Sequence, residues 1–573
     1  MKRTHNCNEL TTNHLGENVV IQGWVNSIRN HGGITFINLR DMYGVIQAVI
    51  PEELEEFVKD VRREFVVEIK GQVVERKKGT KNPSMRTGEI EVVADFVKIV
   101  SASEVLPMDM DNDAEVSDET RLKYRYLDLR KPTMKNNIIF YSKVIQSMRE
   151  FLLENDFLEM ETPLLVKSTP EGARDYIVPS RINKGSFYAL PQSPQLYKQL
   201  IMISGFDRYF QFARCLRDED LRADRQPEHT QLDIEVSFVE SGDVREFIEG
   251  MLKHVFEKIK KIKLEDFQTF TYEEAMSRFG SDKPDLRFDL ELSDVTDIVK
   301  NSSFNVFSEA EYTTCIFVPN DFSRKDIDFF TDIAKRQGAK GLAYMKFNET
   351  FDSGISKFLD DSIKESLIKK LGISCPGTLF FVSDKKRQAQ KALGFVRVEI
   401  AEKLGLRIPD VFKFSWIIDF PLFHFNEEEN RWEPEHHMFS MPKAEFIENF
   451  EYCPEKALGD LWDLALNGIE IASGSIRVSN IEIQERIMKF IGFPKKEAQE
   501  KFGFLLDAYK YGCPSHGGMG LGIARLTSLM LGKNDIREVI LFPKNKNAEC
   551  PMDGSPNIVE KSQLEELGIS IKK

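Results

Sequence analysis

Residues 214–230 form the stretch whose side chains are best suited to bind an anion. The segment, RCLRDEDLRADRQPEHT, alternates arginines with carboxylates. Apolar runs at residues 209–213 and 232–239 flank it, which predicts the loop of a long antiparallel hairpin. An arginine that rises from a sheet is suited to two-pronged contact with a phosphate. A solvated loop of nearly cancelling charges explains the same pattern, so both interpretations stay open at this point.

Residues 517–526, GGMGLGIARL, are a second candidate, because clustered glycines follow a polar turn and lead into a predicted helix at residues 523–531. Glycines let a backbone approach a ligand closely, and a helix start offers free N–H groups to phosphate. Arg525 would lie one turn into that helix. A lone glycine-rich loop is weak evidence for a nucleotide, so this motif needs support from others.

A pair of acids is the third candidate. Asp463 and Glu470 flank a turn and could share a hard cation such as Mg²⁺ through oxygen ligands. Two acids at this spacing are individually unremarkable, so the pair gains meaning only beside the other motifs. The neighbouring His436-His437 pair has no third ligand candidate nearby, which argues against a metal site there.

Five short strands are predicted near the N-terminus, and they would form a domain of their own. Apolar runs between glycine turns occupy residues 19–25, 34–39, 45–50, 66–74 and 89–100, with one helical interruption at 52–63. Five strands in about 100 residues suit a small Greek-key barrel such as the OB-fold. A generic β domain is the alternative.

The rest of the chain reads as mixed helices and strands around the three candidate motifs. Residues 107–120 are acidic and contain a proline, which predicts a hinge, and the helix after it has one apolar face from Phe140 to Leu152. Residues 281–408 have their own balance of strands (315–318 and 378–382) and helices (326–337 and 388–404), which predicts an inserted domain. The predicted segments are 1–105 (barrel), 106–135 (hinge), 136–280 and 415–552 (two parts of one domain), 281–414 (insertion) and 553–573 (C-terminal extension).

Composition limits the partners that the chain can have. It has 573 residues, and 78 Lys and Arg against 92 Asp and Glu give a net charge of −14, so any contact with nucleic acid must be local. Residues 70–86 supply such a patch, with six basic residues and one acid. The polar start and the lack of a long apolar run predict a cytoplasmic protein without a membrane segment. Seven scattered cysteines, with no Cys-x-x-Cys pair, argue against a disulfide framework and a structural zinc site.

Taken together, the motifs resemble a known set. Residues 156–165, DFLEMETPLL, look like the first signature motif of class II aminoacyl-tRNA synthetases, residues 212–230 like the second, and residues 518–526 like the third. The N-terminal barrel resembles that of the aspartate, asparagine and lysine enzymes, and the insertion resembles the GAD-type domain of bacterial aspartyl-tRNA synthetases. The resemblance covers essentially the whole chain. It implies an α+β multidomain fold: an OB-fold barrel, an antiparallel-sheet catalytic domain and an inserted α+β domain.

This resemblance implies an activity and a nucleotide site. The family makes aspartyl-adenylate from aspartate and ATP, and then passes the aspartyl group to the 3′ end of tRNA. Arg217 would hold the α-phosphate, Arg525 would lie beneath adenine and near the γ-phosphate, and these two would be the catalytic residues. Asp463 and Glu470 match ligands of Mg²⁺. The implied ATP-binding set is Arg217, Asp218, Glu219, Gln226, His229, Glu470, Gly522, Ile523, Ala524 and Arg525.

The same resemblance implies an aspartate site. Lys198 and Arg477 match the two cations that hold the side-chain carboxylate, whereas Asp233 matches an acid near the ammonium group and His436 a histidine that closes over the substrate. Without the family, Lys198 would be read as a surface lysine. The implied aspartate-binding set is Glu171, Ser193, Gln195, Leu196, Tyr197, Lys198, Arg217, Asp233, His436 and Arg477.

The resemblance also implies macromolecular partners. Arg29, Phe36 and Gln47 match positions that read the tRNA anticodon, although Phe36 alone would be read as barrel core. His31 with Gly79 looks like the subgroup that charges both tRNA(Asp) and tRNA(Asn). The segment around Pro163 matches the part that pairs two subunits, which predicts a homodimer. The asparagine and lysine enzymes of the subclass, and a catalytically silent tRNA-binding paralogue, are the alternatives.

Overall fold

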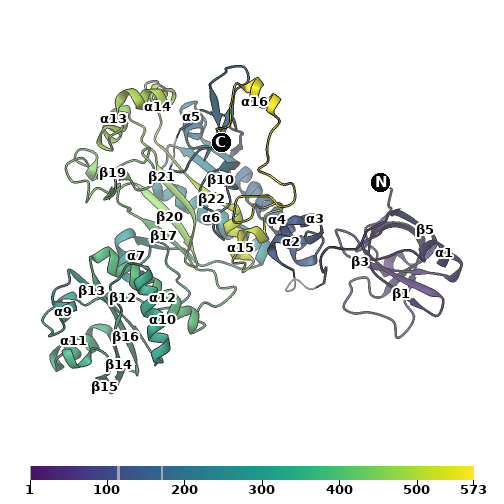
Figure 1. The fold of residues 1–573 in the computed structure, drawn as a ribbon, viewed down its shortest axis with the longest axis horizontal. Helices are drawn as coiled ribbons and strands as arrows, with labels where there is room; N and C mark the ends of the chain where they lie inside the picture. The colour runs from purple at the N-terminus through teal and green to yellow at the C-terminus, as the bar shows by residue number, and fades with distance from the viewer. Residues whose placement is uncertain (1, 112–115, 170–171, 573) are drawn as a thin grey trace. The chain divides into compact units, whose positions relative to one another are not determined.

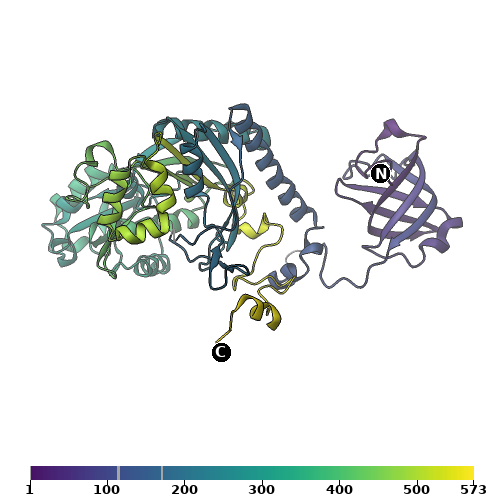
Figure 2. The ribbon, with the colours of Figure 1, turned by 90° about the horizontal axis from the view of Figure 1, so that it is seen from above.

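A computed structural model describes residues 2–111, 116–169 and 172–572 of the chain, which is drawn in Figures 1 and 2. The chain divides into two compact units, Met1–Thr120 and Arg121–Lys573. Among the helices that the structure describes, none is both long enough and apolar enough to cross a membrane.

The first unit contains a closed five-stranded barrel with the strand order β1-β2-β3-β5-β4. All five predicted strands are present, and the closed barrel with this strand order confirms the predicted OB-fold class. Apolar residues at every second position fill the barrel interior. The predicted helical interruption is shorter than expected, since only Glu52–Leu54 (η2) and Glu55–Val58 (α1) are helical. The strands are β1 (Asn18–His31), β2 (Ile34–Arg40), β3 (Val45–Ile50), β4 (Val66–Glu75) and β5 (Ile90–Ser101), preceded by η1 (Thr12–His14).

An eight-stranded sheet forms the centre of the second unit, with the order β11-β17-β20-β21-β22-β10-β9-β6. The inner strands from β17 to β9 all pair antiparallel, as predicted for the catalytic domain, whereas the outer pairs β11–β17 and β6–β9 are parallel. The strands are β6 (Leu158–Glu159), β9 (Arg208–Leu216), β10 (Glu228–Ser237), β11 (Gln268–Thr271), β17 (Phe414–Ile418), β20 (Leu461–Leu466), β21 (Ile469–Ile476) and β22 (His516–Gly522).

One sequence interpretation is corrected by this sheet. Most of the glycine-rich segment is the central strand β22 and not a loop, and helix α15 (Ile523–Met530) follows it directly. The charged segment after β9 is also shorter than predicted, because residues 214–216 and 228–230 continue the two strands of the hairpin.

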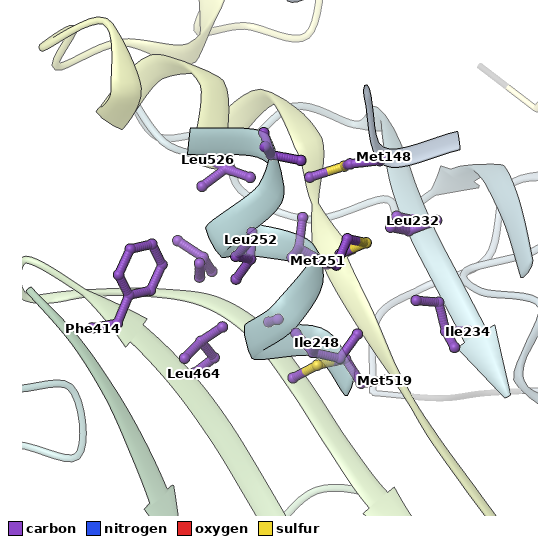
Figure 3. Packing of buried hydrophobic residues seen from close by; sticks show 14 of the residues in the cluster. Met148, Leu232, Ile234, Ile248, Met251, Leu252, Phe414, Leu464, Met519 and Leu526 are labelled. Carbon is purple, nitrogen blue, oxygen red and sulfur yellow. The ribbon is translucent and has the colours of Figure 1, made fainter. Parts of the chain in front are cut away.

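One face of the sheet is covered by helices α4 (Pro132–Glu154), α6 (Ser241–Lys260) and α15, which bury it (Figure 3). Leu232 and Ile234 of β10 and Met519 of β22 point into this core, where they meet Met148 of α4 and Met251 of α6. The apolar face predicted for α4 is confirmed. Since neighbouring residues of a strand point to opposite faces, the residues between these apolar positions must face the other way.

The second face of the sheet carries helix α5 (Gln195–Ile203), which contacts β10 and β9. Leu196 of α5 packs with Phe502 of α14 in a smaller core, so α5 is held between the sheet and the helix pair α13 and α14. Other elements of the second unit are α13 (Ile481–Phe490), α14 (Lys495–Tyr509), β7 (Ile177–Pro179), β8 (Phe187–Ala189), β18 (Phe423–Asn426), β19 (Arg431–Pro434), η5 (Ala444–Phe446) and η6 (Ile536–Glu538).

Residues after helix α7 (Tyr272–Phe279) form a second, separate sheet with the order β12-β13-β16-β14-β15. Alternate residues of β13 and β16 face two different apolar clusters, so helices cover both sides of this sheet. The elements are β12 (Leu292–Asp294), α8 (Thr296–Val299), α9 (Asn305–Ser308), β13 (Tyr312–Val318), α10 (Arg324–Arg336), β14 (Ala343–Asn348), β15 (Thr350–Asp352), η4 (Ser356–Phe358), α11 (Asp361–Leu371), β16 (Gly377–Asp384) and α12 (Lys386–Lys403).

The GAD-type assignment and the segment boundaries stay predictions. Within the predicted hinge, residues 106–135, the structure has two short helices, α2 (Asp118–Lys123) and α3 (Arg125–Asp128), and α4 begins there. The predicted C-terminal extension contains helix α16 (Lys561–Leu567).

Candidate active site

One row of directly opposed residues crosses five strands on the polar face of the central sheet. From β9 to β20 it reads Gln211, Asp233, Gly520, Ser473 and Asp463. Each of these residues alternates with an apolar neighbour that faces the α4–α6 core. The alternation therefore places residues that are more than 200 positions apart in the sequence on one surface.

A cavity of about 700 Å³ lies on this face. It brings together most of the residues predicted for ATP, aspartate and metal binding, which come from α5, β10, β20, β21, β22, α15 and several connections between elements. The predicted residues that line it are Ser193, Gln195, Lys198, Arg217, Glu219, Gln226, His229, Asp233, His436, Asp463, Glu470, Arg477, Gly522, Ala524 and Arg525.

Among the predicted residues that the structure describes, four do not line this cavity. The side chain of Ile523 is fully buried in the α4–α6 core, and Asp218 lies beside Arg174, at 3.6 Å. Leu196 and Tyr197 instead line a separate pocket of about 120 Å³ beside the cavity. Glu171 lies outside the described residues.

Two buried cations and two buried acids meet at one end of the cavity. Lys198 Nζ lies 2.6 Å from Asp233 Oδ1 and 3.1 Å from Glu235 Oε2. The Arg477 guanidinium donates to both oxygens of Glu235, at 2.9 Å and 3.1 Å. All four side chains are at most 2% exposed. Each charge is therefore paired, and a single carboxylate, Glu235, bridges the two cations.

Glu235 was not predicted from the sequence. Burial alone would raise its pKa, but the nearby Arg477 and Lys198 lower the pKa to about 2, so the carboxylate stays ionised. The signal was present in the alternation of β10, where Gln231, Asp233 and Glu235 share one face. Two acids separated by one apolar residue in a buried strand indicate a polar face that needs cations.

Glycines of β22 make room for these polar side chains. A Cβ on Gly518 would lie 2.0 Å from the carbonyl oxygen of Ile234 and 2.2 Å from Glu235 Oε2. A Cβ on Gly520 would lie 2.0 Å from Gln231 Nε2, and Gln231 donates to Asp233 at 2.7 Å. The alternating glycines therefore let the β10 side chains lie flat across the neighbouring strand.

The other end of the cavity carries two arginines and a histidine. Arg217 follows β9 directly, and Arg525 of α15 donates to the carbonyl oxygen of Glu470 at 2.7 Å. His229 of β10 is mostly buried, and burial together with Arg217 and Arg525 lowers its pKa to about 4. At neutral pH His229 is therefore an uncharged flat ring between cations, which suits stacking on a base beside a phosphate site.

Two predicted nucleotide contacts are engaged with other parts of the protein. The Gln226 amide exchanges two hydrogen bonds with the backbone of Lys544, at 2.7 Å and 3.2 Å. Glu219 accepts a hydrogen bond from Arg225 at 2.9 Å. Both side chains still line the cavity, and Gln226 also fixes the segment after η6 against the hairpin.

Asp463 and Glu470 lie on neighbouring strands, joined by the turn at Asn467 and Gly468. Burial and the carboxylates of Glu470 and Asp282 raise the pKa of Asp463 well above its usual value. Its Oδ1 atom is buried and accepts no hydrogen bond from the described residues. No group of three or more potential metal ligands occurs in the part of the chain that the structure describes. An unsatisfied oxygen beside a second acid nevertheless suits a hard cation whose remaining ligands come from the substrate or from water.

His436 and His437 cover the cavity from the segment after β19. Burial lowers the pKa of both imidazoles, which therefore stay neutral at pH 7. His437 Nε2 accepts a hydrogen bond from Arg477 at 2.9 Å, and His436 lies over the acid pair, with Nε2 3.8 Å from Asp463. His437 is thus a further contact of Arg477 that the sequence did not single out for this role.

In the barrel, the predicted anticodon residues share one outer face. Arg29 is directly opposite Phe36 on the neighbouring strand, and Gln47 is opposite Asn38, two residues from Phe36. Phe36 is half-buried and is not part of the barrel core, which excludes the alternative that it fills the interior. Gln47 donates to Glu91 at 2.8 Å.

The two residues predicted to set tRNA choice lie at different places in the barrel unit. His31 is exposed at the end of β1, and Gly79 has a φ of +91° in the connection between β4 and β5. That φ lies in the region that favours glycine, so a side chain at position 79 would be strained.

Comparisons with known proteins match both units. The tRNA synthetases class II (D, K and N) match residues 117–546, and an OB-fold nucleic acid binding domain matches residues 19–100. An "Aspartate--tRNA(Asp/Asn) ligase" of Caldanaerobacter subterraneus subsp. tengcongensis is 48% identical over 100% of this chain and 98% of its own length. An "Aspartate--tRNA ligase" of Ruminiclostridium cellulolyticum is 46% identical over 100% of this chain and 99% of its own length.

Solved structures share the fold. An asparaginyl-tRNA synthetase from Pyrococcus horikoshii, crystallised with asparaginyl-adenylate, has a TM-score of 0.60 at 19% identity over 95% of this chain and 98% of its own. A family match over most of the chain, with full-length relatives near 47% identity, goes beyond a likeness of fold. The chain therefore belongs to the class II aminoacyl-tRNA synthetases of the D, K and N group.

Proposed function

We propose that this enzyme is an aspartate–tRNA ligase, which activates L-aspartate with ATP and then transfers it to the 3′ end of tRNA(Asp). The observation that carries the proposal is the buried pair of cations, Lys198 and Arg477, held side by side by Glu235 in the cavity. The full-length relatives named aspartate–tRNA ligases support the same substrate.

The charge of the pocket selects the amino acid. Lys198 and Arg477 together have more N–H groups than Asp233, Glu235, His437 and Ser475 accept, so donors are left for an incoming carboxylate. The distal carboxylate of aspartate supplies that charge. An asparagine amide would leave one cation underpaired, and a lysine ammonium would face two cations, at a cost of several kcal/mol in a dry site. Asp233, opposite Gly520, then serves the α-ammonium group.

The other end of the cavity would hold the nucleotide. An oxygen of the substrate α-carboxylate attacks the α-phosphorus of ATP and pyrophosphate leaves, so no protein nucleophile is needed. Arg217 stabilises the charge that builds on the α-phosphate, and Arg525 holds the remaining phosphates. His229, neutral at pH 7, stacks on the adenine. Glu219, Gln226 and the start of α15 from Gly522 to Ala524 complete this part of the wall.

Asp463 and Glu470 would hold Mg²⁺ together with the nucleotide. The buried, unsatisfied Oδ1 of Asp463 and the raised pKa of that carboxyl both favour an incoming cation. The ion supplies electrostatic stabilisation of the phosphate charges. The protein's part is to keep the two carboxylates on adjacent strands, on the same side as Ser473.

The barrel would read the anticodon. Phe36 offers a half-buried ring for stacking an unpaired base, worth roughly 1–3 kcal/mol, and Arg29 and Gln47 lie on the same face to contact base edges. The basic residues of the segment 70–86 would bind the backbone phosphates.

Acceptance of tRNA(Asn) as a second substrate is a finer proposal, based on His31 and Gly79. Charging assays with separately purified tRNA(Asp) and tRNA(Asn) test it. We expect aspartate transfer to both, and no transfer to tRNA(Asn) would overturn the dual specificity while leaving the aspartate–tRNA ligase activity intact.

We propose a homodimer on the basis of the first signature motif. We also propose that the enzyme acts in the cytoplasm. Leu158, Leu164 and Leu165 in that motif are each about half exposed, which leaves an apolar surface for a second copy. Light scattering on the purified protein should give twice the mass of the chain, and a stable monomer would contradict the proposal.

Amino-acid-dependent exchange of pyrophosphate into ATP tests the main proposal. Aspartate should support the exchange, and asparagine and lysine should not. Exchange with asparagine or lysine instead would assign the chain to another enzyme of the group, and no exchange with any of the three would indicate a silent paralogue.

A further inference from the structure

A lysine from the connection to the inserted sheet reaches Glu470, one member of the acid pair of the active site. Lys283 Nζ lies 3.8 Å from Glu470 Oε2 and 3.6 Å from Asp282 Oδ1. Asp282 lines the same cavity as Asp463 and Glu470. Three carboxylates therefore line this cavity, and the Lys283 ammonium faces two of them, Asp282 and Glu470.

The loop that carries Asp282 and Lys283 is anchored at both ends. On one side, Gly280 ends α7 against Gly394 of α12, where a Cβ on Gly280 would lie 2.2 Å from the carbonyl oxygen of Gln390. On the other side, the buried Asp285 accepts hydrogen bonds from Arg287 and Arg407. The Lys283 amide also donates to Ser281. These anchors hold the backbone of the loop in place, while 43% of the Lys283 side chain stays exposed.

Asp285 also brings this loop to the strands of the acid pair. A Cβ on Gly468, in the turn between β20 and β21, would lie 3.2 Å from the Asp285 Cβ atom. Glu470 follows that turn by two residues. The loop and the hairpin are thus packed together, so the position of Lys283 relative to Glu470 is set by the fold.

We propose that Lys283 takes the place of the metal ion in the nucleotide-free enzyme and leaves when the metal arrives with ATP. The ammonium lies 3.8 Å from Glu470 and 3.6 Å from Asp282, and the buried Oδ1 of Asp463 stays without a donor among the described residues. A divalent cation that binds alone must displace or repel this ammonium, whereas a metal–nucleotide complex brings phosphates that pair with the displaced lysine. Lys283 thus makes metal binding depend on the nucleotide. The proposal rests on the metal site proposed above.

Binding of Mn²⁺, followed by the electron paramagnetic resonance signal of the free ion, tests this without turnover. The full-length enzyme is titrated with and without ATP and without amino acid, beside Lys283→Met, which keeps the length but removes the charge. We expect Lys283→Met to bind Mn²⁺ without nucleotide at least about fivefold more tightly, because one repulsive charge is gone. Lys413→Met is the control, because it removes a lysine that pairs with Glu265, 2.6 Å away. This variant should bind Mn²⁺ with the same affinity as the unmodified enzyme.

Two outcomes overturn the inference, and they can be told apart. Equal Mn²⁺ affinity of Lys283→Met and the unmodified enzyme, while Glu470→Gln weakens binding with ATP, would refute the role of Lys283 and keep the metal site. Unchanged binding in Glu470→Gln would refute the metal site, and with it both proposals.

Discussion

Glu235 accepts hydrogen bonds from two nitrogens of the Arg477 guanidinium, at 2.9 Å and 3.1 Å, and Arg477 lines the cavity. Neither side chain is more than 2% exposed, so water cannot replace either partner. The pair fixes the guanidinium in one orientation, and the same carboxylate holds Lys198. The specificity proposed for aspartate depends on this arrangement, because both cations must stay charged and in place in the free enzyme.

Replacing Arg477 should separate amino-acid activation from nucleotide binding. Arg477→Ala should lower kcat/KM for aspartate in pyrophosphate exchange by at least about a thousandfold, since a charge-assisted contact in a dry site is lost. The affinity for ATP, measured by calorimetry, should change by less than about threefold. Normal activation of aspartate by this variant would contradict the pocket assignment.

A second variant controls for folding. Arg477→Ala removes a main partner of a buried carboxylate, which typically costs about 3–5 kcal/mol of unfolding free energy. Adding Glu235→Gln removes the buried carboxylate that has lost its guanidinium partner, so the double variant should recover stability in urea without recovering aspartate activation.

The ionised Glu235 should also contribute to acid sensitivity. Its folded pKa, about 2, lies below the ordinary 4.5, so its stabilisation is present above pH 4.5 and is lost as the pH falls from 4.5 toward 2. That shift corresponds to roughly 3 kcal/mol. The free energy of unfolding, measured in urea, should differ most between the unmodified enzyme and Glu235→Gln near pH 6, and the difference should shrink below about pH 4.5. A difference independent of pH would contradict the assignment.

The two glycines of β22 should respond differently to alanine. Gly518→Ala meets the backbone oxygen of Ile234, which cannot move aside, so it should cost about 1–3 kcal/mol of unfolding free energy or more. Gly520→Ala meets only the flexible end of Gln231, so it should cost less stability but raise the KM for aspartate by displacing a partner of Asp233. Equal destabilisation, with an unchanged KM for aspartate in Gly520→Ala, would contradict this division.

His229 should act as a stacking surface and not as an acid or base. His229→Phe keeps a flat ring and should hold the KM for ATP within about threefold. His229→Ala should raise it about tenfold, in line with roughly 1–3 kcal/mol for a base stacked on a ring. A pH–rate profile with the same shape in His229→Phe is the second readout, because the imidazole has a pKa of about 4 and is already neutral at pH 7. Loss of activity in His229→Phe would contradict the stacking role.

The barrel strands were predictable because alternation and glycine turns are local signals, and β3 (Val45–Ile50) was predicted to the residue. The three motifs could be placed in one site only through the family resemblance, since nothing local shows that Asp233 and Asp463 share a row across the sheet. The sequence predicts a loop for the glycines of β22, because their role is tertiary and has no local signal: they make room for residues of β10.

Glu235 and Lys283 show two ways in which sequence reasoning missed functional residues. The alternation of polar and apolar residues in β10 indicates a role for Glu235, although the family resemblance did not single it out. Lys283 carried none, because its contact with Glu470 spans 187 positions and depends on how a connection to the inserted sheet packs on a hairpin. Such contacts are set by packing between elements, which local patterns do not describe.

A crystal structure of the enzyme with L-aspartate and ATP bound tests the central claim most directly. The account predicts that both oxygens of the distal carboxylate lie within hydrogen-bond distance of Lys198 Nζ and the Arg477 guanidinium, with Glu235 still between them. A structure in which those oxygens lie far from both cations would contradict it.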